Sequence, residues 1–211
     1  DGTVGAALVA DPRVRGVVFT GSTDAARSIQ RALAGRVAPG GGAIPLIAET
    51  GGQNAAVVDS SALPEQAVID LIASGFDSAG QRCSALRILL VQHEIADHLL
   101  AMLRGAMQEL RIGRPDRLDT DIGPVIDAEA RDAIRRHVEA MRGHGFPVFA
   151  AALAPECATG TFVPPTLIEI PDPSVLGREV FGPVVHVVRY RRDELDTMID
   201  KVNALGYGLT F

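Results

Sequence analysis

The sequence predicts an α/β fold built on a mostly parallel sheet, and the alternation of two kinds of segment supports this class. Short apolar runs of strand length alternate along the chain with segments in which apolar residues recur at helical spacing. Strands and helices that alternate in this way favour parallel pairing, with helices covering the sheet. The chain of 211 residues is long enough for one good core or for parts of two.

Apolar runs bounded by glycine, proline or polar residues predict the strands. The continuous apolar run at 86–92 is typical of a buried strand. The expected strands lie at residues 15–22, 46–52, 54–59, 86–92, 147–152, 161–170 and 184–190.

Amphipathic spacing predicts the helices. The first helix can be capped by Ser22 or Thr23 and can end at Gly35. A polar, aspartate-rich loop is expected over 112–127, and the loop at 36–45 is rich in glycine and proline, which suggests a domain boundary nearby. The expected helices lie at residues 22–35, 63–80, 94–110, 128–145 and 193–206.

Composition narrows the function classes. The formal net charge of -6 gives no reason to expect a nucleic acid or an anionic membrane as a partner. No apolar run reaches membrane-spanning length, and two distant cysteines favour a reducing compartment over a disulfide framework. The histidines do not cluster at metal-ligand spacing, so no metal site is expected. His186, within an apolar strand, is expected to be a hydrogen-bonded core or sheet-face residue.

Cys83, in the stretch AGQRCSALR, is the first candidate for chemistry. It follows a predicted helix and a glycine and precedes a buried strand, and side chains at such junctions often face a cleft. Arg82 could stabilise the thiolate and lower the pKa of the thiol. A small buried residue is the alternative, because free cysteines are often buried. Cys157 has no comparable setting and is interpreted as structural or exposed.

Three further stretches place polar groups at strand ends. Glu49 ends an apolar strand in LIAETGG, where desolvation would raise its pKa and suit a general base; a solvated glutamate is the alternative. Glu179, in GREVFGPVV, could accept hydrogen bonds from a ligand hydroxyl pair or could simply be solvated. Gly21 and Ser22, in FTGSTDAAR, precede a helix N-terminus of the kind that binds phosphate, although no complete GxGxxG fingerprint is present.

The order of these stretches along the chain is informative. FTGST, ETGGQNA, GQRC and EVFGPV resemble the motif order of the aldehyde dehydrogenase superfamily, and the separation between Glu49 and Cys83 is the one expected there. ETGGQNA with GQRCSALR and TDIGPVID is similar to the L-glutamate γ-semialdehyde dehydrogenase group, in the bacterial version fused to a proline dehydrogenase domain. The resemblance covers essentially the whole chain and implies an aldehyde dehydrogenase-like α/β fold.

The resemblance implies NAD-dependent oxidation of L-glutamate γ-semialdehyde to L-glutamate, the second step of proline catabolism. Cys83 would attack the aldehyde carbon to give a thiohemiacetal, hydride would pass to NAD, and a thioester would remain. Glu49 would activate the water that hydrolyses this thioester. The Cys83 N–H would be one donor to the oxyanion.

The resemblance also implies two substrate contacts. Ser84 matches a serine that hydrogen-bonds the α-carboxylate of the substrate, and a plain polar residue at the strand entry is the alternative. Phe76 matches an aromatic wall of the substrate tunnel, whereas the sequence by itself favours a core residue.

On the cofactor side, the resemblance implies roles for residues in four of the motifs. Gly21 and Ser22 would lie near the pyrophosphate of NAD, and Gly51 would lie against the nicotinamide, where a side chain would collide. Glu179 would bind the ribose next to the nicotinamide, with the ring of Phe181 packed beside it.

The resemblance divides the chain into two domains. Residues 1–48 would be the C-terminal part of a Rossmann-like NAD-binding domain, and residues 49–211 a catalytic domain truncated at its C-terminal end. The chain begins at Asp1 without a methionine and ends in an apolar stretch, so we expect a segment of a longer protein. The parent is expected to be a cytoplasmic homo-oligomer with a fused proline dehydrogenase domain, and the isolated segment to be inactive.

Four alternatives stay open at this point. The substrate could be succinate semialdehyde or another aldehyde, and Ser84 would discriminate between them. A non-catalytic structural fragment is disfavoured because Glu49 and Cys83 are both present. A cysteine hydrolase would want a histidine near the thiol, and no histidine is placed by the sequence to supply it. A CoA-acylating dehydrogenase typically lacks the glutamate that is here Glu49.

Overall fold

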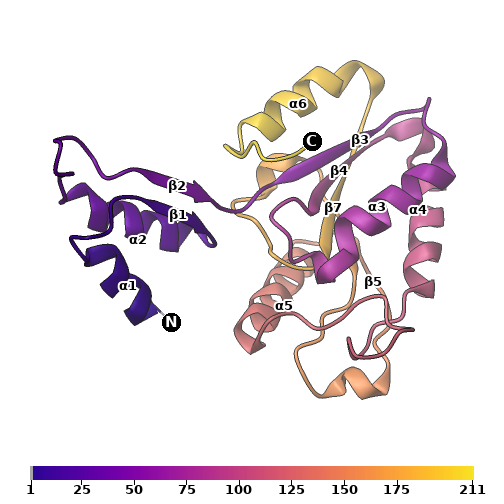
Figure 1. Cartoon of the computed structure of the whole chain (residues 1–211). Helices are drawn as coiled ribbons and strands as arrows, with labels where there is room; N and C mark the ends of the chain where they lie inside the picture. Colours follow the sequence, from indigo (N-terminus) through magenta and orange to yellow (C-terminus); the bar gives the residue numbers. More distant parts are fainter. Residues whose placement is uncertain (1) are drawn as a thin grey trace. The chain divides into compact units, whose positions relative to one another are not determined.

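The computed structural model describes residues 2–211, and these residues fall into two compact units that divide between Gly51 and Gly52 (Figure 1). Each unit contains a hydrophobic core of its own. The glycine- and proline-rich loop at 36–45 lies inside the first unit, between a helix and a strand, and the division follows it.

The first unit, over its described residues, is a small α/β layer with two parallel strands. Its elements are α1 (Gly2–Ala10), β1 (Val17–Thr20), α2 (Thr23–Ala34) and β2 (Leu46–Glu49). The Ser22 side chain caps α2 by accepting a hydrogen bond from the Ala25 N–H at 3.2 Å, and Gly35 follows the last helical residue. Both ends of this helix confirm the prediction.

Helix α1 is absent from the sequence-based prediction. It carries two glycines, which weaken a helix, and its remaining side chains do not form the polar face of an amphipathic helix. Its buried residue, Val9, packs with Leu33 of α2 and with Ile44, which precedes β2. Tertiary packing therefore supports a helix that local propensity does not indicate.

The second unit is organised around a five-stranded sheet in the order β3-β4-β7-β6-β5, within the part of the chain that the structure describes. All neighbouring strands run parallel except β5, which is antiparallel to β6. The central strands β4 and β7 are almost wholly buried. The strands are β3 (Asn54–Val58), β4 (Leu86–Gln92), β5 (Val148–Ala150), β6 (Thr166–Glu169) and β7 (Val184–Tyr190).

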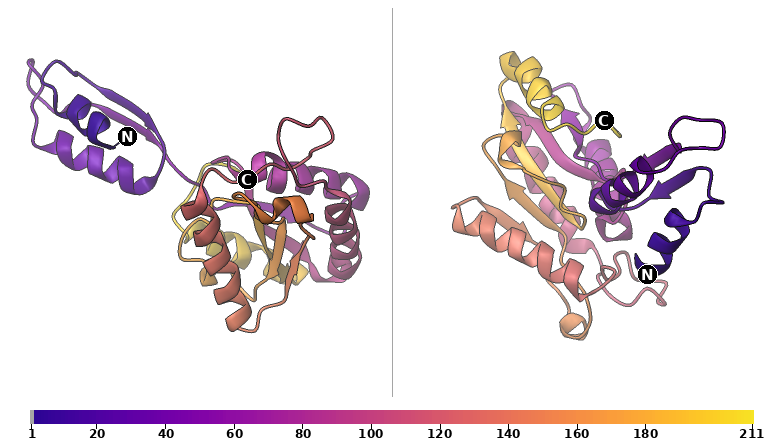
Figure 2. Two further views of the ribbon diagram at one scale, coloured as in Figure 1. Left: turned by 90° about the horizontal axis from the view of Figure 1, so that it is seen from below. Right: turned by 90° about the vertical axis from the view of Figure 1, so that its left-hand side faces the viewer.

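Helices cover both faces of this sheet. Helices α3 and α4 lie on one face, and α5 and α6 lie on the other (Figures 1 and 2). Side chains of β7 alternate between the two faces, as strand geometry requires, so His186 points toward α5 whereas Val187 faces α4. The helices are α3 (Pro64–Phe76), α4 (His93–Glu109), α5 (Ala128–Gly143) and α6 (Leu195–Asn203).

The predicted class, α/β with a mostly parallel sheet, is confirmed by the strand pairing. The strand expected over 161–170 is shorter in the structure, where only 166–169 pair as β6. Pro164 and Pro165 precede this stretch and carry no N–H group to donate to a neighbouring strand.

Candidate functional site

Cys83 lies on the loop between α3 and β4, which we call the cysteine loop (residues 77–85). The side chain of Cys83 is half-buried, and the neighbouring Arg82 and Ser84 are exposed. The loop lies at the amino-terminal end of β4, one of the two most deeply buried strands. A partly accessible thiol is thus attached to a rigid scaffold, as the junction between helix and strand predicts.

The cysteine loop begins with an unusual turn. The helix predicted over 63–80 ends at Phe76, and Ser78, Ala79 and Gly80 have φ angles of 55°, 55° and 64°. Left-handed backbone is uncommon for residues other than glycine, and such strain often occurs at functional sites. A Cβ on Gly80 would lie 2.2 Å from the carbonyl oxygen of Gly182, so the loop can approach that residue only with glycine here.

Asn54, at the start of β3, fixes the backbone on both sides of Ser84. Its Nδ2 donates to the carbonyl oxygens of Cys83 at 2.6 Å and Ala85 at 2.8 Å. Gly52 approaches the same place, since a Cβ there would lie 2.8 Å from the Cys83 carbonyl oxygen. Among the hydrogen bonds of residues 2–211, none uses the Cys83 N–H.

Gln81 anchors the other side of the cysteine loop. Its Oε1 accepts from the Ile126 N–H at 2.8 Å, and its Nε2 donates to the carbonyl oxygens of Ser78 at 3.1 Å and Pro124 at 3.3 Å. One amide side chain therefore joins the left-handed turn to the segment before α5.

Arg87 links the cysteine loop to a second turn, residues 177–183, which we call the Glu179 turn. Its Nε and Nη2 donate to Oε1 of Glu179 at 3.2 Å and 3.0 Å. Its Nη1 donates to the Gly182 carbonyl at 3.1 Å, and its Nη2 also donates to the Arg82 carbonyl at 3.0 Å. The Arg87 side chain is fully buried, whereas that of Glu179 is 12% exposed. Burial lowers the pKa of Arg87, and the charge of Glu179 opposes that change.

Phe181 completes the Glu179 turn. Its ring is 45% exposed, and the Cζ of Arg87 lies 5.4 Å from the ring centroid. The structure thus brings Glu179, Phe181 and the backbone next to Cys83 together around one arginine. The sequence-based interpretation missed Arg87, although an arginine inside the apolar run LRILLVQ was a signal that a buried partner must exist.

The other residues predicted to bind the cofactor, and the residue predicted to act as general base, lie in the first unit. Gly21 and Ser22 are exposed at the start of α2, and Glu49 is exposed at the end of β2. The Gly21 N–H donates to the Glu49 carbonyl at 3.1 Å, so these residues share the carboxyl edge of the two strands. Gly51 is half-buried.

Phe76 and Cys157 are buried. Phe76, the last residue of α3, is 1% exposed and packs in the main core of the second unit, as its alternative interpretation predicts. Cys157 is 4% exposed, and its thiol donates to the Ile112 carbonyl at 3.3 Å. Burial raises the pKa of Cys157, which marks it as a structural thiol.

His186 also behaves as a core residue and confirms its prediction. It is 1% exposed, and its Nδ1 lies 3.2 Å from the Arg87 carbonyl oxygen. Its Nε2 lies 2.8 Å from Nε2 of His137 on α5. Burial lowers the pKa of both imidazoles, to about 3 for His186.

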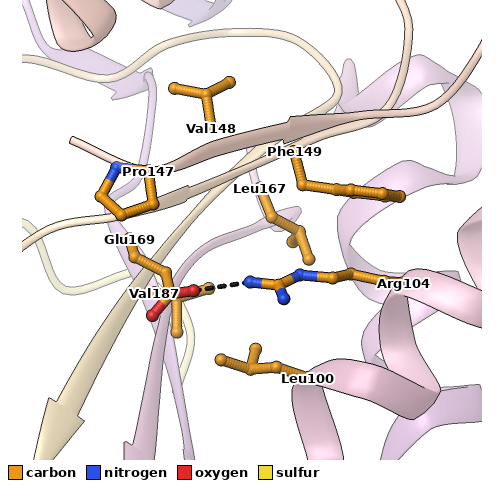
Figure 3. A pocket seen from close by; sticks show the side chains of 8 residues that line it. All are labelled: Leu100, Arg104, Pro147, Val148, Phe149, Leu167, Glu169 and Val187. Carbon is orange, nitrogen blue, oxygen red and sulfur yellow. Dashed lines mark hydrogen bonds and ion pairs between the residues drawn. The ribbon is translucent and has the colours of Figure 1, made fainter. Parts of the chain in front are cut away.

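A cavity of about 260 Å³ lies between α4 and the strands β5 and β6 (Figure 3). Arg104 and Glu169 form an ion pair at its wall, with 2.6 Å between Nη2 and Oε1. The ring of Phe149 lies over the Arg104 guanidinium, with 5.9 Å from Cζ to the ring centroid. Cys83 and Glu179 do not line this cavity, so it is separate from the cysteine loop.

Two features of the described residues bear on the kind of site. Over residues 2–211, no group of three or more histidine, cysteine, aspartate or glutamate side chains is arranged to hold a metal ion. In the same residues, every helix is too short or too polar to cross a membrane.

Comparison with known proteins identifies relatives of the chain. It is 62% identical over 213 residues to the bifunctional protein PutA of Klebsiella aerogenes, a match that covers 99% of this chain and 16% of that protein. It is 34% identical over 210 residues to the 1-pyrroline-5-carboxylate dehydrogenase of Geobacillus kaustophilus, covering 98% of this chain and 40% of that protein.

A crystal structure of a mutant proline utilization A from Bradyrhizobium japonicum matches with a TM-score of 0.92 at 48% identity, covering 99% of this chain and 21% of that one. The chain thus spans less than half the length of each of these relatives. The model of the aldehyde dehydrogenase family matches residues 1–211. With its cysteine loop, its Glu179 turn and this match over its entire length, the chain belongs to the aldehyde dehydrogenase family.

Proposed function

We propose that this chain carries the catalytic cysteine of an NAD-dependent dehydrogenase that oxidises L-glutamate γ-semialdehyde to L-glutamate. The observation that carries the proposal is the half-buried Cys83 on a loop held by Asn54, Gln81 and Arg87. The names of the relatives, bifunctional protein PutA and 1-pyrroline-5-carboxylate dehydrogenase, support this substrate class. Since the chain spans part of each relative, the activity is proposed for the complete parent protein.

In the proposed chemistry the Cys83 thiol loses its proton to solvent and its sulfur bonds to the aldehyde carbon, while the electron pair of the carbonyl moves onto oxygen. The Cys83 N–H is one donor to that oxygen. A nicotinamide cofactor, when bound, accepts the hydride that leaves the carbon. Glu49 then takes a proton from water, and the water oxygen attacks the thioester carbon. Cleavage of the carbon–sulfur bond releases the carboxylic acid, and the Cys83 thiolate takes up the proton that Glu49 removed from water.

The residues present fit a dinucleotide cofactor. In the first unit, Ser22 begins a helix of 12 residues, and a helix N-terminus attracts phosphate. The Ser22 oxygen accepts from the Ala25 N–H, which leaves its hydroxyl proton for a phosphate oxygen. We assign Gly21 and Ser22 to the pyrophosphate and Gly51 to the nicotinamide. The family generally uses NAD or NADP, and NAD is our specific assignment.

In the second unit, we assign the Glu179 carboxylate to the ribose next to the nicotinamide. Both hydrogen bonds from Arg87 go to Oε1 of Glu179, so Oε2 can accept from a ribose hydroxyl. The exposed ring of Phe181 offers a surface beside it. A role of Phe76 in the wall of the substrate tunnel stays a prediction.

Ser84 is the proposed selector of the substrate. It is exposed next to Cys83, so its hydroxyl can donate to the α-carboxylate of an amino-acid semialdehyde. Succinate semialdehyde, whose carboxylate carries no α-amino group beside it, and other aldehydes are the competing substrates. A simple aliphatic aldehyde would not need this contact.

The organisation of the parent is also part of the proposal. Residues 1–48 would belong to the NAD-binding domain and residues 49–211 to the catalytic domain. The PutA relatives are called bifunctional, and a fused proline dehydrogenase domain would account for that description. A homo-oligomer in the cytoplasm remains the expectation from the sequence.

The test is pre-steady-state kinetics on the complete parent protein. Glu49→Gln should give a stoichiometric burst of NADH followed by slow turnover, because hydride transfer precedes hydrolysis. Cys83→Ser should abolish the burst. Glu65→Gln, at an exposed glutamate in the first turn of α3, is the matched control and should behave as wild type. Unchanged steady-state turnover in Glu49→Gln would show that another group is the base, and a burst in Cys83→Ser would overturn the assignment of the nucleophile.

A further inference from the structure

Within residues 2–211, Arg87 is the only buried residue of the four types that carry a full charge, arginine, lysine, aspartate and glutamate. A buried charge is costly unless it is paired and hydrogen-bonded. Packing alone does not account for a guanidinium here, because the surrounding strand is otherwise apolar except for its last residue. The contacts of Arg87 therefore need a purpose that an apolar residue could not serve.

The contacts themselves suggest that purpose. The guanidinium binds the backbone one residue before Cys83, the carboxylate of Glu179 and the carbonyl of Gly182. These groups are far apart in the sequence and belong to two different loops. A planar guanidinium offers five N–H donors in a fixed fork, which lets one side chain set the distance and the angle between the two loops.

We propose that Arg87 is a positioning residue that holds the cysteine loop and the Glu179 turn in one geometry and balances the charges of Cys83 and Glu179. The inference rests on the proposed function, in which Cys83 is the nucleophile and Glu179 binds the ribose. It adds that the two are coupled: a change at Glu179 alters Cys83 through Arg87.

The charges of Arg87 and Glu179 determine in which direction each substitution should change the reactivity of Cys83. The negative charges of Glu179 and of the Cys83 thiolate both favour the charged form of Arg87, although burial outweighs them and lowers its pKa. By Coulomb's law a positive Arg87 likewise attracts negative charge on the Cys83 sulfur, and a negative Glu179 partly cancels that attraction. Removing the arginine and removing the glutamate charge should consequently change the reactivity of Cys83 in opposite directions.

The test measures alkylation of Cys83 by iodoacetamide, a neutral reagent, in the complete parent protein without cofactor, with the labelled peptide identified by mass spectrometry. Arg87→Gln should slow alkylation, because the cysteine loop loses a hydrogen bond and a neighbouring positive charge. Glu179→Gln keeps an oxygen acceptor for Arg87 and should speed alkylation. Arg87→Lys keeps the positive charge but loses the planar set of N–H donors. Its alkylation rate should therefore lie between those of Arg87→Gln and wild type, and it should still raise the KM for NAD more than it lowers kcat.

Arg104→Gln is the matched control, because Arg104 also pairs with a glutamate but lies at the separate cavity (Figure 3). It should leave alkylation and the KM for NAD unchanged. If Arg87 only supported the fold, Arg87→Gln and Glu179→Gln would change alkylation in the same direction or leave it unchanged, and the inference would fail. If Arg87→Gln does not fold, an unchanged or slower rate in Glu179→Gln still overturns it. Alkylation needs no turnover, so this result is independent of whether the parent oxidises the semialdehyde.

Discussion

Acidification is expected to weaken the second unit through His186. The Arg87 carbonyl can only accept a hydrogen bond, so Nδ1 of His186 carries the proton and its Nε2 accepts from Nε2–H of His137. A second proton on His186 would place two N–H groups against each other in a buried site. Burial, followed by the charge of His137, lowers the pKa of His186 from 6.5 to about 3.

The size of the effect follows from this pKa. Since the folded-state pKa lies below the unfolded value, the contribution of His186 to stability is fully present above about pH 6.5 and is lost as the pH falls toward 3. At about pH 5 the pH is about 1.5 units below the unfolded pKa, and each unit corresponds to about 1.4 kcal/mol. The free energy of unfolding should therefore fall by about 2 kcal/mol from this group alone.

Urea unfolding followed by tyrosine fluorescence measures the loss. Both tyrosines, Tyr190 and Tyr207, lie in the second unit, and the chain has no tryptophan. Between about pH 7.5 and about pH 5, His186→Gln should lose about 2 kcal/mol less stability than wild type. His98→Gln, at an exposed histidine of α4, should show the full wild-type loss. Identical pH dependence in wild type and His186→Gln would refute the reasoning.

Other consequences can be measured on the chain or its parent. Gly80→Ala should lower the free energy of unfolding by about 2 kcal/mol or more, because its Cβ would meet the Gly182 carbonyl. Gly105→Ala, in open space on α4, should instead stabilise by up to about 1 kcal/mol, and equal Tm shifts in the two variants would contradict the argument. In the parent, Ser84→Ala should raise the KM for L-glutamate γ-semialdehyde by about tenfold and spare a simple aliphatic aldehyde; equal effects on both would count against a carboxylate contact. The isolated chain should not form NADH from the semialdehyde, and turnover comparable to the parent's would disprove this.

Features that depend on neighbouring residues could be predicted from the sequence. The run at 86–92 is the strand β4, and Ser22 caps α2, because apolar periodicity and helix capping are local properties. The motif order also pointed to Cys83 and Glu179, which the structure brings together around one arginine. The turn at residues 78–80 is the exception, since two of its residues adopt a backbone that their side chains disfavour.

Features that depend on distant pairing could not be predicted. Arg82 is next to Cys83 in the sequence and was the expected influence on its thiol, yet its side chain is exposed. Arg87 points inward instead, and its partner Glu179 is brought to it only by the pairing of β4 with β7. The sequence can indicate that a buried arginine needs a counterion, but it cannot say which glutamate provides it.

The environment of Asn54 has a chemical consequence. Its Nδ2 faces two carbonyl oxygens, and its Oδ1 accepts from the Thr210 N–H at 3.2 Å, so the orientation of the amide is fixed. Aspartate has nearly the same shape but would place a charged oxygen against two other oxygens. Position 54 therefore distinguishes asparagine from aspartate by the direction of its hydrogen bonds rather than by side-chain size. Deamidation, which replaces the amide nitrogen by oxygen, would turn the two attractive contacts beside Cys83 into repulsive ones.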